Sequence, residues 1–97
     1  MEYNKEKVEA AKILFAEVLE LNQQLPKERD IEMRIWGMEN PKVDVIFWHT
    51  DSNGTYDYAD EDHFEVYLTD EDWHRSFESS FADITAKMQE WKELYCN

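Results

Sequence analysis

The stretch KVDVIFWHTDSNG at residues 42–54 decides the fold. In its first nine residues Val43, Val45 and Phe47 recur at every second position, which is the period of a β-strand with one buried face. The Asp51–Gly54 segment that follows is a tight-turn signal, because an Asn-Gly pair accepts the positive φ angles of a hairpin turn. We therefore predict a central strand that enters an antiparallel hairpin, which Thr55 to Tyr58 extend briefly.

Two further segments alternate in the same way. Residues 30–37 are predicted as the strand that precedes the Gly37–Pro41 turn, and residues 63–68 as the strand that follows the acidic residues 60–62. Short connections favour antiparallel pairing of these strands. The side chains expected on the core faces of the two strands are Ile31, Met33, Ile35, Phe64, Val66 and Leu68.

Helical periodicity flanks the strands on both sides. The first helix is predicted from an Asn4 cap to about Gln24, ahead of Pro26, with apolar residues at Val8, Ala11, Phe15, Val18 and Leu19. The second is predicted to begin at a Thr69 cap, with the acids at 70–72 in its first turn, where they favour the helix dipole. Its core-facing stripe is predicted to be Trp73, Phe77, Phe81, Ile84, Met88, Trp91 and Tyr95.

These elements define the fold class. We predict a single acidic α+β domain over residues 1–97, with an α-β-β-β-α order and a three-stranded antiparallel sheet packed against two helices. The sequence leaves open whether the helices cover one face of the sheet or both. If they cover one face, the other remains for solvent or a partner.

The charge of the chain is concentrated in one third of its length. Between Lys42 and Arg75 there are ten acids and no base, so most of the net charge of −13 lies there. Such a charge repels nucleic acid and anionic membranes, and its natural complement is a basic protein surface. The acids at 70–72 have a local explanation as first-turn residues. We therefore expect the partner-binding carboxylates to be Asp51, Asp57, Asp60, Glu61, Asp62 and Glu65.

Aromatic residues accumulate on the second face of the predicted sheet. The strand register places Arg34, Ile46 and Trp48 on that face, and Trp, Tyr and Arg are the residues that most often anchor protein interfaces. The alternative is that these aromatics pair across strands and shield the backbone. The residues we select as aromatic contacts are Trp36, Trp48 and Tyr67.

Other classes of site find little support. We predict no enzyme, because the chain has no nucleophile elbow, no phosphate-binding glycine loop and no Cys–His set. We predict no metal and no cofactor: Tyr56 stands where a calcium loop needs glycine, and the single cysteine, Cys96, excludes a multi-cysteine zinc site. No basic leader or membrane-length apolar run is evident, which predicts a cytoplasmic protein.

The segment Tyr56-Asp57-Tyr58-Ala59-Asp60-Glu61-Asp62, the length and the α-β-β-β-α order together carry one resemblance. In layout the chain resembles the small acidic anti-defence proteins of bacteriophages, which include anti-CRISPR proteins and DNA-mimic anti-restriction proteins. The resemblance contains no diagnostic motif, so no functional residue follows from it. It implies a phage or mobile-element protein that acts in the host cytoplasm and blocks the nucleic-acid-binding site of a defence nuclease.

A second interpretation stays open. The chain would then be an immunity protein, an antitoxin or an adaptor that binds a protein partner through its aromatic sheet face. Ionic strength separates the two, because acidic mimicry weakens steeply with salt and an aromatic interface responds little. The sequence does not indicate the partner, the stoichiometry or the oligomeric state.

Overall fold

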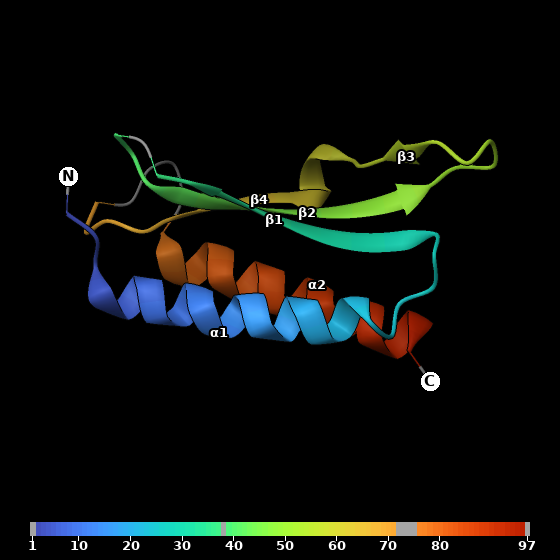
Figure 1. Cartoon of the computed structure of the whole chain (residues 1–97), viewed down its shortest axis with the longest axis horizontal. Coiled ribbons are helices and arrows are strands. Elements are labelled where there is room, and N and C mark those ends of the chain that lie inside the picture. The colour runs from blue at the N-terminus through green and yellow to red at the C-terminus, as the bar shows by residue number, and fades with distance from the viewer. Residues whose placement is uncertain (1, 38, 72–75, 97) are drawn as a thin grey trace.

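The computed structural model describes residues 2–37, 39–71 and 76–96, and it confirms the α+β class. The chain forms two layers, with both helices beneath one face of an antiparallel sheet (Figure 1). The predicted brief extension of the hairpin forms the two-residue strand β3, so the sheet has four strands where three were predicted. In chain order the elements are α1 (Lys5–Asn22), β1 (Arg29–Trp36), β2 (Lys42–Thr50), β3 (Tyr56–Asp57), the 3₁₀ turn η1 (Asp60–Asp62), β4 (His63–Tyr67) and α2 (Phe77–Tyr95).

β2 is the centre of the sheet, as its sequence predicts. β1 pairs antiparallel along one side of it, with Ile31 opposite Phe47 and Arg34 opposite Asp44. β4 pairs along the first half of the other side, and β3 along the second half. The turn between β2 and β3 contains Gly54 at φ 80°, a conformation that favours glycine. β1 is therefore an edge strand.

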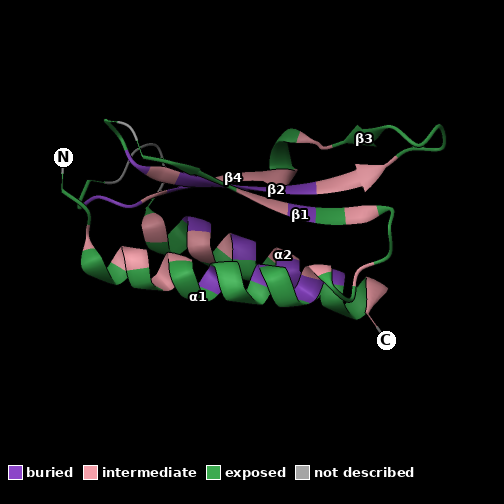
Figure 2. Ribbon diagram, in the orientation of Figure 1, coloured by how far each residue is buried: buried purple, intermediate pink, exposed green. Residues whose placement is uncertain are grey.

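The core lies between the sheet and the helices. Val45 and Phe47 of β2 are completely buried there, and Phe47 meets Phe64 and Trp91 edge to face at 5.8 and 5.1 Å. Figure 2 shows the buried positions facing one another across the two layers. Burial of these aromatic and branched side chains is the main source of stability in a domain of this size. The other buried apolar residues around this core are Leu14, Val18, Leu21, Ile31, Val43, Val66, Leu68, Ile84, Met88 and Trp91.

The apolar face of α1 was only partly predicted. Asn4 caps the helix as expected, with its side chain accepting a hydrogen bond from Lys7 N–H at 3.0 Å. The buried residues, however, are Leu14, Val18 and Leu21, and the predicted core residues Phe15 and Leu19 are about half exposed. α1 carries a wider apolar arc than the core covers, so one flank of the helix stays bare.

The predicted start of the second helix was wrong. α2 begins at Phe77, where the Ser76 side chain caps it by accepting from Ser79 N–H at 3.1 Å. Thr69 is buried and pairs instead with Tyr3 in an isolated β-bridge, so Asp70 and Glu71 precede the helix. The predicted stripe is confirmed from Phe77 to Tyr95. The predictions for Asp72 and Trp73 lie outside the described residues.

The second sheet face is free of helices, but it is less open than predicted. Ile46, which was expected on the exposed face, is 1% exposed, and Asp44 on the same face is 5% exposed. Ile46 lies between Glu32 and His63 in the strand register, and Tyr58 contacts the rings of Trp48 and His63 at 4.7 and 5.9 Å. The segment before η1 therefore covers the middle of this face.

Candidate functional site: the open sheet face and an acidic groove

Two tryptophans on the open face hydrogen-bond to carboxylates on neighbouring strands. Trp36 Nε1 donates to Asp44 Oδ2 at 2.7 Å, and Trp48 Nε1 donates to Glu32 Oε1 at 3.0 Å. The indole rings thus lie across the β1–β2 pair and shield its backbone. This packing role is the alternative to partner binding that the sequence left open for these aromatics. Trp36 is nevertheless 40% exposed, and so retains an accessible apolar surface.

Arg34 belongs to the same network. Its Nε lies 3.2 Å from Glu32 Oε1, and this contact is the main reason that the pKa of Glu32 is lowered. Trp48 adds a second donor to the same carboxylate. On the β1 side of the open face, Glu32 is therefore paired with a base of its own strand.

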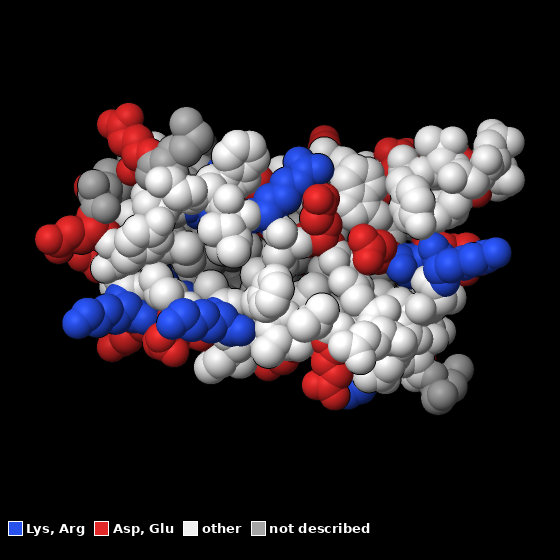
Figure 3. Space-filling view, viewed as in Figure 1, with Lys and Arg blue, Asp and Glu red and all other residues white. Residues whose placement is uncertain are grey.

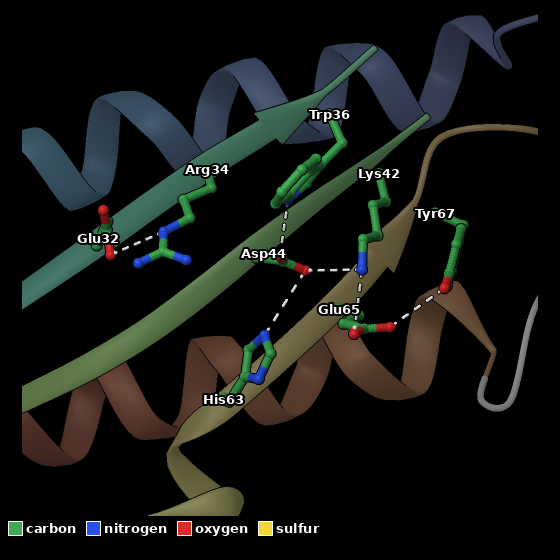
Figure 4. Close-up of polar contacts among 8 residues, drawn as sticks. All are labelled: Glu32, Arg34, Trp36, Lys42, Asp44, His63, Glu65 and Tyr67. Atoms are coloured by element: carbon green, nitrogen blue, oxygen red, sulfur yellow. Dashed lines mark hydrogen bonds and ion pairs between the residues drawn. The ribbon is translucent and has the colours of Figure 1, made fainter. Parts of the chain in front are cut away.

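A compact charged cluster occupies the β2–β4 side of the face (Figure 4). Lys42 Nζ lies 3.2 Å from Glu65 Oε1 and 3.5 Å from Asp44 Oδ1. Tyr67 also donates to Glu65, at 3.2 Å. Burial opposes the charge of Glu65, but the hydrogen bonds from Lys42 and Tyr67 outweigh it and lower the pKa of Glu65. His63 Nε2 faces Asp44 Oδ1 at 3.6 Å and completes the cluster.

This cluster is the one group of possible metal ligands found among the described residues. Asp44, His63 and Glu65 each offer an atom, and the three atoms lie within 4.8 Å of one another. One carboxylate oxygen of Asp44 and Nε2 of His63 are buried and have no hydrogen-bond partner in the described structure. The ammonium of Lys42 already lies between the two carboxylates, however. A divalent ion would have to displace Lys42, so the geometry is that of an internal ion-pair cluster.

The predicted acidic contacts divide into three pairs. Asp51 accepts from Asn53 and Thr55 N–H and thereby fixes the hairpin turn, and Asp57 accepts from Tyr58 N–H. Asp62 and Glu65 are paired with lysines, Asp62 with Lys87 at 2.9 Å. Asp60 and Glu61 are exposed in η1, and no ion pair or side-chain hydrogen bond involves them in the described structure.

Asp60 and Glu61 meet acids that the sequence did not associate with them. A groove of about 460 Å³ between η1 and α2 is lined by both residues and by Asp83 and Glu90 of α2. Its lysine, Lys87, is held by Asp62. Burial lowers the pKa of Lys87, but the contact with Asp62 and the nearby charges of Glu90 and Glu61 more than compensate, so that the pKa is raised. We call the surface formed by Asp60, Glu61, Asp83 and Glu90 the acidic groove.

The structure thus separates the predicted site residues. Trp36, Trp48, Tyr67 and Glu65 lie together on the open sheet face, whereas Asp60 and Glu61 lie at its β4 side beside α2. Asp51 and Asp57 belong to the hairpin beyond. The prediction for this helix concerned only its apolar stripe, so it did not include Asp83 and Glu90. These two acids lie seven residues apart. That spacing of about two turns places both on one face of the helix, and was the available signal.

Within the described residues, no helix is long and apolar enough to cross a membrane. Comparisons of the chain with protein-family models, with curated proteins and with solved structures find no match.

Proposed function

We propose that this chain is a protein inhibitor that blocks the nucleic-acid-binding site of a defence nuclease by acidic mimicry. The observation that carries the proposal is the acidic groove, where Asp60 and Glu61 meet Asp83 and Glu90 across two segments distant in sequence. Carboxylates held on a rigid scaffold offer Lys and Arg side chains the same charge as a phosphate backbone.

The electrostatics support this function over a solely structural role for the acids. The carboxylates of the Lys42 cluster have an ion-pair partner within the fold, whereas Asp60 and Glu61 have none among the described residues. Repulsion between such acids opposes folding unless a partner or solvent offsets it. A basic groove on a nuclease offsets this repulsion, and long-range attraction speeds the encounter.

The test is a double charge reversal, Asp60→Lys with Glu61→Lys. The matched control is Glu28→Lys with Glu39→Lys, which changes the net charge equally at two exposed acids outside the groove. The wild-type chain is expressed in bacteria whose CRISPR-Cas or restriction system targets a phage. It is expected to raise the plating efficiency of that phage. The groove variant should lose this effect, and the control should keep it. Equal activity of the folded groove variant and wild type would refute acidic mimicry.

A direct binding experiment complements the cellular one. Immobilised chain is expected to retain a nucleic-acid-binding protein from a host lysate, and duplex DNA should elute that protein by competing for the same site. A retained protein that DNA does not release would contradict the proposal. Binding should also weaken steeply between about 50 and 200 mM salt.

The second candidate function is an immunity protein, antitoxin or adaptor that uses the aromatic sheet face. It is favoured by the 40% exposure of Trp36 beside Arg34. In that case Trp36→Ala should weaken partner binding, salt should have little effect, and the groove variant should bind normally. The two candidates therefore give opposite results with the same set of proteins.

A further inference from the structure

At the edge of the molecule formed by β1 and α1, some backbone N–H and C=O groups of β1 have no hydrogen-bond partner within the described residues. Thr50 N–H donates to Glu28 C=O at 2.9 Å, so the even-numbered residues of β1 turn their backbone groups toward β2. The odd-numbered residues must then turn theirs outward. Ile31 satisfies both of its outward groups through Asn22, whose side chain accepts from Ile31 N–H at 3.0 Å and donates to its C=O at 2.7 Å.

Beyond Asn22 the edge is open. Met33 and Ile35 turn outward in the same way, and no residue in the described ranges hydrogen-bonds to them on that side. Natural edge strands are usually short, charged or covered, because unpaired backbone groups recruit another strand. Here one end of β1 is closed by an Asn side chain and the other is left available.

Apolar side chains surround the open part of the edge. Ile35 is 69% exposed, and on the adjacent flank of α1 Phe15 and Leu19 are 49% and 53% exposed. A groove of about 780 Å³ separates strand from helix, with Val8, Phe15, Met33 and Ile35 in its lining. Figure 3 looks onto this edge and shows a broad uncharged band between the two layers. An apolar patch of this kind marks an interaction site.

We propose that the β1–α1 edge docks a second copy of this chain, with the two β1 strands antiparallel. A second copy supplies what the edge lacks in both layers at once. Its own β1, with the Gly37 that follows it, pairs with the open groups of Met33 and Ile35, and its α1 covers the exposed flank at Phe15 and Leu19. A single peptide strand would satisfy the sheet layer and leave the helix flank bare.

The charges fit this occupant. The charged residues that line the groove are Lys5, Lys12 and Glu9, so this edge carries bases as well as an acid. β1 itself carries two acids and two arginines. The acid-rich strands and turns lie on the opposite side of β2, so the two copies approach along their least acidic edges.

A two-fold axis at Ile35 sets Met33 of each chain opposite Gly37 of the other, the residue that follows β1. It sets Ile35 opposite its own copy, and it sets Arg34 of each chain opposite Trp36 of the other on the open sheet face. Trp36 is 40% exposed and Arg34 is also exposed, so both can make the cation–π contact that this register allows.

Sedimentation equilibrium over a range of concentrations tests the proposal. Ile35→Pro deletes an outward N–H and leaves the β2 ladder intact, because that ladder uses the even residues. Phe15→Lys charges the apolar flank. Each variant is expected to weaken self-association at least about tenfold. The matched control is Ile13→Lys, since Ile13 lies on the same helix, is 59% exposed and does not line the groove. Circular dichroism confirms that each variant is folded.

The expected result is a wild-type dimer that the control variant preserves. In a Cys96→Ser background, Ile35→Cys should also form an intermolecular disulfide, and Leu94→Cys, at a 58% exposed site elsewhere, should not. If the wild-type chain stayed monomeric up to about 100 µM, the proposal would be overturned. The open edge would then be a site for a strand of another protein. The proposal would also be overturned if either Ile35→Pro or Phe15→Lys left the dissociation constant of the dimer unchanged.

Discussion

Replacing Lys42 by Met is expected to destabilise the protein by about 2–3 kcal/mol at pH 7. The side chain of Asp44 is 7% exposed and that of Lys42 24%, and the two are 3.5 Å apart. Removing one partner of a fully buried ion pair costs about 3–5 kcal/mol, because it leaves an uncompensated charge. The Glu65 side chain is 36% exposed, so solvent screens that half of the cluster and the lower part of the range applies.

Chemical denaturation followed by tryptophan fluorescence measures this loss, and thermal melting should show a fall in Tm of roughly 10–20 °C. The control is Lys12→Met, which removes an ion pair to Glu9 whose side chains are 69% and 67% exposed. Such an exposed pair contributes less than about 0.5 kcal/mol. If Lys42→Met were no more destabilising than Lys12→Met, the cluster would not be a stabilising feature of the fold.

The effect of Lys42→Met should also depend on pH. The pKa of Glu65 is lowered from its ordinary value of 4.5, so its contribution to stability is present above that value and is lost as the pH falls through the folded-state pKa. The pKa of Lys42 is raised from 10.5, because its contacts with Glu65 and Asp44 outweigh burial, so its contribution is lost only as the pH rises beyond that value. The difference between wild type and variant should therefore be largest between these limits and shrink in acid. A difference that stayed constant down to pH 2–3 would contradict the ionic origin of the effect.

Three further predictions concern the same cluster, the start of α2 and the core. In the Lys42→Met protein, Zn²⁺ should raise Tm, because Asp44, His63 and Glu65 then offer three ligand atoms within 4.8 Å without a competing ammonium; equal melting in Zn²⁺ and EDTA would count against this. Ser76→Ala should destabilise the protein by about 1 kcal/mol in urea denaturation through loss of the α2 cap, whereas Ser76→Asp should keep the cap; equal stability of the two would disprove this role. Phe47→Ala should cost about 3–5 kcal/mol by the same assay, since Phe47 is 0% exposed, and far more than Phe15→Ala on the bare flank of α1; similar losses at the two positions would contradict the assigned core.

The sheet could be predicted from the sequence because its signals are local. The alternation of Val43, Val45 and Phe47 and the Asn53-Gly54 pair are sufficient to define β2 and the turn that follows. The start of α2 was wrong because two capping signals compete in this region. Thr69 followed by acids satisfies the local pattern, but the pairing of Thr69 with Tyr3 continues the sheet edge and leaves the cap to Ser76.

The candidate site was less predictable, since it depends on which side chains meet. Sequence reasoning placed Asp62 and Glu65 with the partner-binding acids, but the fold brings Lys87 to the first and Lys42 to the second. The exposure of Phe15 and Leu19 has a similar origin. Periodicity reveals an apolar arc on a helix, and only the neighbouring layers determine how much of that arc is covered.

The two proposed surfaces lie on opposite sides of the central strand and can act together. β1 pairs along one side of β2, and β4, which leads out of η1, pairs along the other. A dimer formed through the β1–α1 edges therefore leaves both acidic grooves exposed. On a partner with two basic sites this arrangement raises the effective concentration of the second groove once the first is bound. Ile35→Pro should then weaken inhibition of such a partner without changing the affinity of a single groove. Asp60→Lys with Glu61→Lys should abolish inhibition and leave the dimer intact, so the two surfaces can be tested independently.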